Sequence, residues 1–167
     1  VSVKEVVEYK AGIQKVALVD CGTKNNIIRA FLGRDITVLR VPYNYDFTKI
    51  EAHGIVISNG PGDPKLNTRT IEHAMIAMQS NKPILGICLG SQILALAAGA
   101  DTYKLKYGHR GHNQPCNELG TKRCYITSQN HGYAVDTKTL PQDWSEWFIN
   151  NNDGTNEGVK HNSKPFF

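Results

Sequence analysis

The apolar residues of the first hundred positions follow two patterns that alternate along the chain. One pattern is a short continuous run bounded by Gly or Pro, which is typical of a buried strand. These runs occupy residues 15–20, 36–41, 54–58 and 83–87. Between them, apolar residues recur three or four positions apart, as in amphipathic helices, at 23–32, 68–79 and 89–99. The alternation predicts an α/β fold with a mostly parallel, doubly wound open sheet and helices on both faces.

Local signals refine these boundaries. Thr23 is expected to cap the first helix, which Gly33 ends, and a helical turn is expected near 47–52. Met75 and Met78 have helical spacing, which favours packing in the core over contact with a cofactor. The polar residues 1–14 predict an extended lead-in.

The chain changes character after Gly99. Strand-like pieces separated by Gly, Asn and Asp turns follow at residues 102–106, 124–128, 133–135, 146–149 and 158–161. We expect this part to be antiparallel and rich in loops, and to form the edge of the sheet and the cover of a site. Because 167 residues are most simply one domain, residues 1–167 are predicted to form a single domain.

Composition excludes several classes of function. The 40% hydrophobic and 20% charged residues describe an ordinary soluble protein, and the 19 Lys and Arg form no run of five, which argues against a nucleic-acid partner. No apolar stretch approaches the ~20 residues that cross a bilayer, and the first residues lack the apolar region of a signal peptide. The four cysteines have no disulfide-framework spacing, so we expect reduced thiols and a cytoplasmic protein.

Cys88 lies at the joint between a predicted strand and a predicted helix. Gly86 and Gly90 flank it and relieve crowding, which is the layout of a nucleophile elbow. A helix N-terminus stabilises negative charge, so we expect Cys88 to be a nucleophilic thiolate at neutral pH. The alternative is that Cys88 is a small buried hydrophobic residue, as most cysteines are.

Two polar segments are further candidates for a site. The Gly-Pro-Gly turn in 58–64 follows the third strand, and its backbone N–H groups can face an anion, although an ordinary turn has the same composition. The amides and glycine of 127–133 suit a polar, zwitterionic ligand, although a β-hairpin turn also explains them, less specifically. His131 in this segment is either a general base or an ordinary loop histidine.

Four residues could be written as a zinc site: His109, His112, Cys116 and Cys124. Two, three and seven residues separate them, and the chain has no Cys-x-x-Cys pair. Because the Cys-x-x-Cys pair typical of zinc sites is missing, we expect no metal centre.

Four motifs together carry a resemblance to a known family. They are NGPGDP (59–64), GICLGSQ (86–92), YGHRGHNQP (107–115) and TSQNHGYAVD (127–136). In order and spacing they resemble class I glutamine amidotransferase domains, and more narrowly the glutaminase part of carbamoyl-phosphate synthetase. The DW, NEG and KPFF segments at 143–144, 156–158 and 164–167 resemble forms in which this domain is fused into a larger eukaryotic polypeptide.

The resemblance implies a role for each matching residue. Cys88 would attack the side-chain amide of glutamine, form a thioester and release ammonia, while the N–H groups of Leu89 and Gly60 would form the oxyanion hole. Residues that would hold the substrate are Gly62, Gln92, Asn130, Gly132 and Tyr133. The ammonia would pass to a synthetase large subunit or a fused synthetase domain, which alone would use ATP and Mg²⁺, because no ATP-binding signature or cofactor site is present here.

The sequence departs from the family pattern in three respects. The family's base and orienting acid lie in a His-Pro-Glu motif, and the sequence stops at Phe167 before it, so we expect a domain truncated there. The family's preceding domain, which contributes a serine to the glutamine site, is also missing, and Ser91 replaces the usual histidine of CLGHQ. The alternative function is therefore a catalytically impaired or non-catalytic interface or regulatory module of the same synthetase. A dinucleotide-binding fold is excluded because no GxGxxG follows the first strand.

Overall fold

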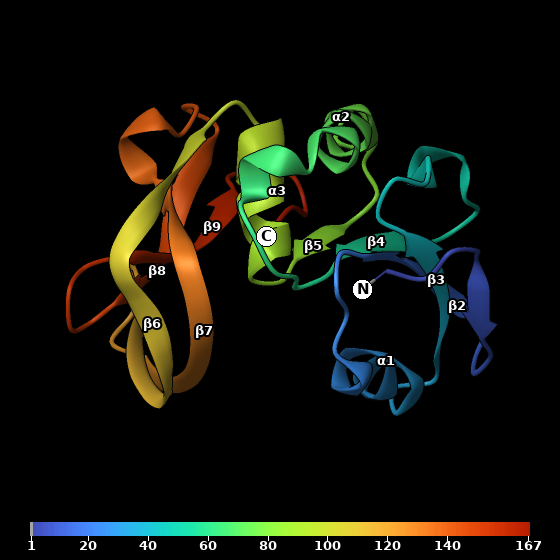
Figure 1. Ribbon diagram of the computed structural model, residues 1–167, viewed down its shortest axis with the longest axis horizontal. Helices are drawn as coiled ribbons and strands as arrows, with labels where there is room; N and C mark the ends of the chain where they lie inside the picture. The colour runs from blue at the N-terminus through green and yellow to red at the C-terminus, as the bar shows by residue number, and fades with distance from the viewer. Residues whose placement is uncertain (1) are drawn as a thin grey trace.

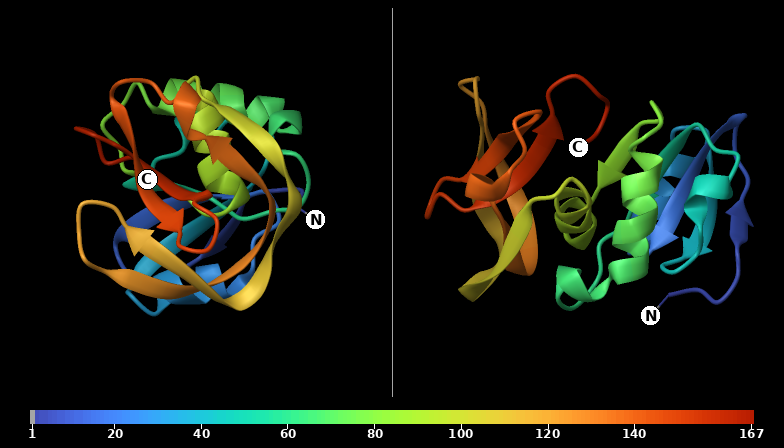
Figure 2. Two further views of the ribbon diagram at one scale, coloured as in Figure 1. Left: turned by 90° about the vertical axis from the view of Figure 1, so that its left-hand side faces the viewer. Right: turned by 90° about the horizontal axis from the view of Figure 1, so that it is seen from above.

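A computed structural model describes residues 2–167 and shows two sheets with helix α3 (Leu89–Ala97) between them (Figures 1 and 2). The first sheet holds the strands β1 (Val7–Tyr9), β2 (Gln14–Asp20), β3 (Ile36–Pro42), β4 (Gly54–Ile57) and β5 (Ile84–Gly86). The second sheet holds β6 (Asp101–Glu118), β7 (Cys124–Asp136), β8 (Trp144–Asn150) and β9 (Asn156–His161). The remaining helices are α1 (Asn25–Leu32), α2 (Thr68–Ala77) and three short 3₁₀ turns at Phe47–Lys49, Pro64–Leu66 and Thr137–Thr139.

The first sheet has the strand order β1-β3-β2-β4-β5, in which all neighbours are parallel except β1 and β3. Helix α1 lies on one face of this sheet, and α2 and α3 lie on the other (Figure 1). The predicted doubly wound α/β fold is therefore confirmed. Its direction of winding reverses between β2 and β4, and in such folds ligands bind outside the carboxyl ends of the strands at that point.

Both faces of the central strands are buried, which explains why their apolar runs are continuous. Ala17 and Ile57 face the cluster that includes α2 and α3, whereas Leu18 and Val56 pack with Ile28 of α1. The hydrophobic core thus consists of two layers, one on each side of the sheet.

Asp20 ends β2 with a fully buried carboxylate. It accepts hydrogen bonds from the backbone N–H groups of Val3, Gly22 and Thr23 and forms an ion pair of 2.8 Å with Arg40. Burial by itself raises the pKa of Asp20, but the N–H donors and the Arg40 guanidinium outweigh it, so the pKa lies below its usual value. A lowered carboxyl pKa means that the folded state favours the ionised form.

We expect Asp20→Asn to destabilise the chain by about 3 kcal/mol at pH 7, because it removes one partner of a buried ion pair. A lowered folded-state pKa contributes stability above the unfolded pKa of about 3.9, and this contribution is lost as the pH falls through the folded value. The difference in unfolding free energy between Asp20→Asn and the parent chain, measured by urea unfolding, should therefore be smaller at pH 3 than at pH 7. Glu72→Gln, which removes the exposed pair with Arg69, serves as a control and should change stability by less than about 0.5 kcal/mol. An equal gap at both pH values would contradict this prediction.

Several local predictions for the first sheet were wrong. Thr23 does not cap α1, because Lys24 occupies the cap position without a side-chain hydrogen bond and the Thr23 hydroxyl is buried without a partner. Met75 is half exposed, and only Met78 packs against the core, since the two positions lie at the margin of the apolar face of α2. Leu85 in β5 is exposed because a cavity borders it.

Other boundaries also shifted. The lead-in expected over 1–14 contains the short strand β1 at its described residues, while Val1 lies outside them. The helical turn expected over 47–52 ends at Lys49, and Asp46 caps its start by accepting a hydrogen bond from the Thr48 N–H. Gly99 ends α3 as predicted and has a φ of +99°, which suits glycine.

The strands after Gly99 are antiparallel, as predicted, but they form a sheet of their own, with the order β7-β6-β8-β9. The predicted contribution to the edge of the first sheet is confirmed only at Phe166, which pairs in parallel with Ile84 of β5. The pieces expected at 102–106, 124–128 and 133–135 belong to a long β6–β7 hairpin, whose register shifts after Lys104 and after Gly111. The pieces expected at 146–149 and 158–161 are confirmed as the separate strands β8 and β9. The segment 127–133 is therefore part of strand β7 and not a hairpin turn.

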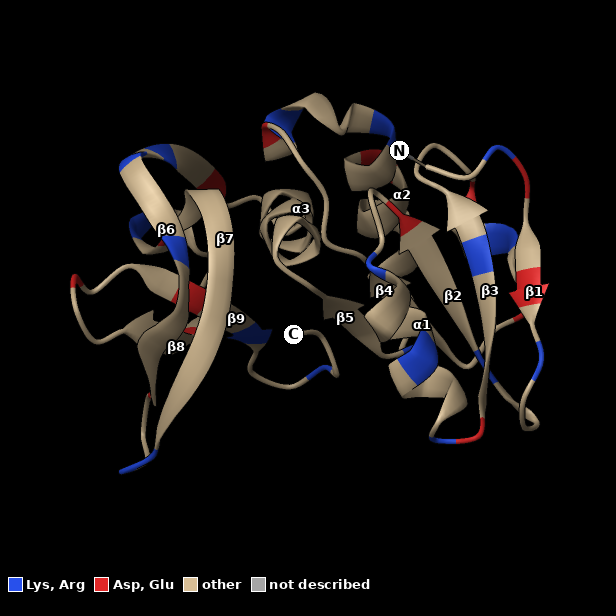
Figure 3. Cartoon of the chain, turned by 60° about the horizontal axis from the view of Figure 1, so that its bottom comes forward, with Lys and Arg blue, Asp and Glu red and all other residues tan. Residues whose placement is uncertain are grey.

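Charged residues of both signs are scattered over the two sheets (Figure 3). Among residues 2–167, no helix has the length and apolar character needed to span a membrane.

Candidate active site

Cys88 occupies the sharp turn between β5 and α3 with φ 55° and ψ −109°. A positive φ in a non-glycine residue is strained and is held only by its surroundings. A Cβ on Gly90 would lie 2.0 Å from the Ile57 carbonyl oxygen, and one on Gly86 would lie 2.5 Å from the Ser91 backbone. Both glycines are therefore required by close packing, and the predicted elbow conformation is confirmed.

The loop after β4 is tied to the loop after β2 by side chains at its start. Ser58 Oγ accepts from the Cys21 N–H at 3.0 Å, and Asn59 Nδ2 donates to the Gly22 carbonyl at 3.1 Å. Asn59 Oδ1 also accepts from the Lys24 N–H at 3.2 Å. These bonds fix the direction in which the Gly-Pro-Gly turn leaves the sheet.

Gly60 lies directly against the elbow. A Cβ at this position would lie 2.7 Å from Leu89 Cδ2 and 2.2 Å from the Cys21 carbonyl oxygen, so only glycine fits. Gly62 has a φ of +95° and no atom within 4 Å of its Cβ position, so this part of the turn is open.

Strand β7 supplies the opposite wall. Gln92 of α3 donates from Nε2 to the Tyr133 carbonyl at 2.7 Å, which joins the helix behind the elbow to the second sheet. Asn130 is exposed, and none of the side-chain hydrogen bonds of the described residues involves its amide. Its amide is thus free to meet a polar ligand.

One cavity of about 710 Å³ brings together every site residue predicted from the sequence. They are Cys88, Leu89, Gly60, Gly62, Gln92, Asn130, Gly132 and Tyr133. The cavity lies at the carboxyl ends of β2 and β4 and is closed by β7. It is also lined by Lys24, Asp63 and Arg110, which were not predicted as site residues, although Asp63 lies in the NGPGDP motif and Arg110 in the YGHRGHNQP motif.

The Cys88 thiol is exposed to the cavity, but the protein around it removes water. This burial is the main reason that its pKa is raised, and the Glu157 carboxylate adds to the effect. The Leu89 N–H and the Lys24 ammonium oppose it without cancelling it. The expectation of a thiolate at neutral pH was therefore wrong, because it counted the helix N-terminus and left out burial.

We expect iodoacetamide to alkylate Cys88 at pH 7 more slowly than a free cysteine, and the rate to keep rising beyond pH 9. The thiolate is the reactive form, and a raised pKa lowers its fraction at every pH below that pKa. Mass spectrometry of the modified peptide measures the rate, with Cys21 as the internal control because burial raises its pKa to about 12. A rate that reaches its plateau by pH 8 would contradict the raised pKa.

The four residues considered as a zinc site do not come together. His112 is bonded to Ser128 Oγ, Cys116 is buried against Thr127 and Gln129, and Cys124 is exposed. His109 instead lies beside His131 and Glu157, a grouping that sequence spacing could not reveal.

Comparison with known proteins decides the family. The family model described as "Glutamine amidotransferase class-I" matches residues 17–167. The chain belongs to the class I glutamine amidotransferase family. The resemblance found in the four sequence motifs is thereby confirmed, and the cavity around Cys88 is the candidate active site of this amidotransferase domain.

Several curated relatives share more than half of their aligned residues with this chain. The chain is 56% identical over 154 residues to "Multifunctional protein pyr-3" of Neurospora crassa and 54% identical over 170 residues to "Multifunctional protein CAD" of Squalus acanthias. It is 53% identical over 155 residues to "Carbamoyl phosphate synthase arginine-specific small chain" of Neosartorya fischeri. These alignments cover 92%, 100% and 91% of the chain but only 8%, 8% and 34% of the respective relatives.

Solved structures share the fold. A protein from Thermoplasma acidophilum described as a putative GMP synthase subunit superposes with a TM-score of 0.78 at 22% identity, over 92% of this chain and 80% of that one. A glutamine amidotransferase from Thermotoga maritima gives a TM-score of 0.73 at 18% identity, over 92% of this chain and 73% of that one. At these identities the likeness establishes the fold alone.

Proposed function

We propose that this chain is the glutaminase domain of a glutamine-dependent carbamoyl-phosphate synthetase and supplies ammonia for carbamoyl phosphate formation. The observation that carries the proposal is the meeting of eight residues, predicted from three separate motifs, in one cavity around the Cys88 thiol. Relatives named as a carbamoyl phosphate synthase small chain and as multifunctional proteins, at more than half identity, support the choice of synthetase.

The proposed reaction passes through a thioester. Cys88 Sγ bonds to the side-chain amide carbon of glutamine, the carbon–nitrogen bond breaks, and ammonia leaves with the proton that the thiol gives up. Water then attacks the thioester carbon, which yields glutamate and restores the thiol. Because the resting thiol is largely protonated, its proton has to leave as the sulfur attacks.

The negative charge that develops on the amide oxygen needs donors at the elbow. The Leu89 N–H already faces the Cys88 sulfur and begins α3, where the helix dipole is positive at its end. The turn at Gly60 packs closely on Leu89, which supports the Gly60 N–H as the second donor. Two such donors form an oxyanion hole of the kind that amide hydrolysis requires.

The rest of the cavity suits the amino-acid end of glutamine. Gly62, Gly132 and the exposed amide of Asn130 offer backbone and side-chain groups for hydrogen bonds, and Tyr133 and Gln92 form the wall between them. The ammonia would then pass to a synthetase large subunit or fused synthetase domain, where ATP and Mg²⁺ would be used.

A thiol-directed glutamine analogue, such as the chloroketone of the glutamine side chain, tests the proposal. We expect it to modify Cys88 in the protein as encoded, and excess glutamine should slow the reaction. The modified peptide is identified by mass spectrometry, and Cys124→Ser is the control because Cys124 is exposed outside the cavity. Modification of Cys21 or Cys116 with Cys88 left free would overturn the assignment of the nucleophile.

A further inference from the structure

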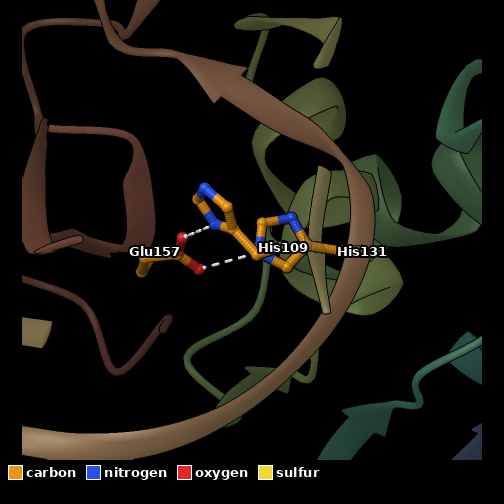
Figure 4. A group of neighbouring side chains, drawn as sticks. All are labelled: His109, His131 and Glu157. Atoms are coloured by element: carbon orange, nitrogen blue, oxygen red, sulfur yellow. Dashed lines mark hydrogen bonds and ion pairs between the residues drawn. The ribbon is translucent and has the colours of Figure 1, made fainter. Parts of the chain in front are cut away.

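A second cluster of chemically active side chains lies between strands β6, β7 and β9. It consists of His109, His131 and Glu157, which we call the histidine–glutamate cluster (Figure 4). Glu157 Oε1 lies 2.9 Å from His109 Nδ1, and Oε2 lies 3.1 Å from His131 Nε2. The side chains are 13%, 10% and 10% exposed in that order, and the three facing atoms lie within 4.8 Å of one another.

The backbone positions the two histidines as a pair. His109 and His131 face each other across the β6–β7 ladder, and their ring centroids are 4.9 Å apart at an interplanar angle of 86°. Gly108, with a φ of +70°, allows this approach, because a Cβ there would lie 2.5 Å from the His131 carbonyl oxygen. Glu157 reaches them from the start of β9.

The outer nitrogen of each ring faces a group that can only accept a hydrogen bond. His131 Nδ1 lies 2.9 Å from the Tyr133 carbonyl oxygen, and His109 Nε2 lies 2.9 Å from the Asp153 carboxylate. Both outer nitrogens therefore carry the proton in the neutral rings. The inner nitrogens, His131 Nε2 and His109 Nδ1, are left with lone pairs directed at Glu157. The Asn150 amide nitrogen also lies 3.4 Å from His109 Nδ1, a long contact for a hydrogen bond.

A carboxylate has no proton to offer these lone pairs. His131 Nε2 is fully buried and forms no hydrogen bond, although Glu157 Oε2 lies close to it. A single cation among the three groups would accept the lone pairs of both inner nitrogens and of the carboxylate at once, and the three facing atoms already lie within 4.8 Å of one another.

We propose that the histidine–glutamate cluster binds a first-row divalent transition metal, with Zn²⁺ as the best fit. Two imidazole nitrogens and one carboxylate are a zinc donor set that leaves a fourth position open. The outer hydrogen bonds to Asp153 and to the Tyr133 carbonyl are the partners that orient ligating histidines in metalloproteins. Two of the three ligands, His131 and Glu157, line a cavity of about 670 Å³ that Cys88 also lines.

Titration with Zn²⁺, and with Co²⁺ as a coloured substitute, tests the site in the protein as encoded after removal of metal by a chelator. The titration is done with Cys88→Ser present throughout, so that the cavity thiol cannot bind the ion. We expect one equivalent to bind, with His109→Asn and Glu157→Gln each weakening the affinity by about 10- to 100-fold. His112→Asn is the matched control, since His112 lies on the same strand outside the cluster, and it should bind as the parent does.

A measurement without cluster variants keeps the test decisive if those variants fold poorly. Bound Co²⁺ should give the intense visible bands of a four-coordinate site with no thiolate charge-transfer band, and metal should shift the ring resonances of His109 and His131 but not of His112. The proposal would be overturned by absence of binding, by a thiolate charge-transfer band, or by a metal affinity of His109→Asn and Glu157→Gln that equals that of the parent. The cluster would then be a set of ion pairs.

Discussion

We expect Cys88→Ser to lower the proposed glutamine hydrolysis by about 10⁴-fold or more, because a hydroxyl in place of the thiol removes the proposed nucleophile, through which the rest of the site would act. Serine has nearly the same shape, so the elbow and its positive φ are kept and the fold is unchanged. Release of ammonia from glutamine by the protein as encoded measures the effect. In the same preparation, carbamoyl phosphate synthesis from added ammonia should be unaffected, because that step does not use the thiol.

The control for this prediction is Cys124→Ser, which changes an exposed thiol outside the cavity and should retain full glutaminase activity. A Cys88→Ser protein that still hydrolyses glutamine would refute the thioester route. Loss of both the glutamine-dependent and the ammonia-dependent reactions would point instead to a damaged fold.

Gly90→Ala is expected to cost about 3 kcal/mol of unfolding free energy or more, despite the usual gain of about 1 kcal/mol when alanine replaces glycine in a helix. The new Cβ would lie 2.0 Å from the Ile57 carbonyl oxygen, and this atom belongs to a buried backbone that cannot move away. Urea unfolding followed by circular dichroism measures the loss. The first turn of α3 would move away from β4, so the Gly90→Ala protein should lose glutaminase activity as well as unfolding free energy.

Gly33→Ala is the matched control for the packing argument. Gly33 has an ordinary helical conformation at the end of α1. The nearest atom to a Cβ added at this position is the Arg29 carbonyl oxygen, at 3.2 Å. We expect this variant to stay within about 1 kcal/mol of the parent chain. Equal stabilities of Gly90→Ala and Gly33→Ala would show that α3 does not need its close approach to β4.

The parallel half of the fold could be predicted from the sequence because its signals are local. Continuous apolar runs such as 15–20 and 54–58 are buried on both faces, and the helices between them have clear periodicity. The second sheet was harder to predict. The β6 strand shifts register after Lys104 and after Gly111, so its alternation is interrupted and only fragments are visible in the sequence.

The site was predictable to the extent that motifs mark it. Gly60, Cys88 and Asn130 come from three motifs far apart in the chain, and the winding of the sheet together with the β6–β7 hairpin brings them to one cavity. Two contacts of the site could not be predicted, because they join residues that are far apart in the sequence. Glu157 approaches His131 and raises the pKa of Cys88 from another strand, and neither contact has a signature in sequence spacing.

The bond from Gln92 to the Tyr133 carbonyl spans the seam between the two sheets. The parallel half contributes the sulfur and the glycine loop, while the antiparallel half contributes the amide of Asn130 and the aromatic wall. Neither half contains a complete binding surface, so the shape offered to a ligand is set by how the halves are seated on each other. A fragment limited to the parallel half would keep its bent cysteine and have nothing opposite to hold a substrate against it.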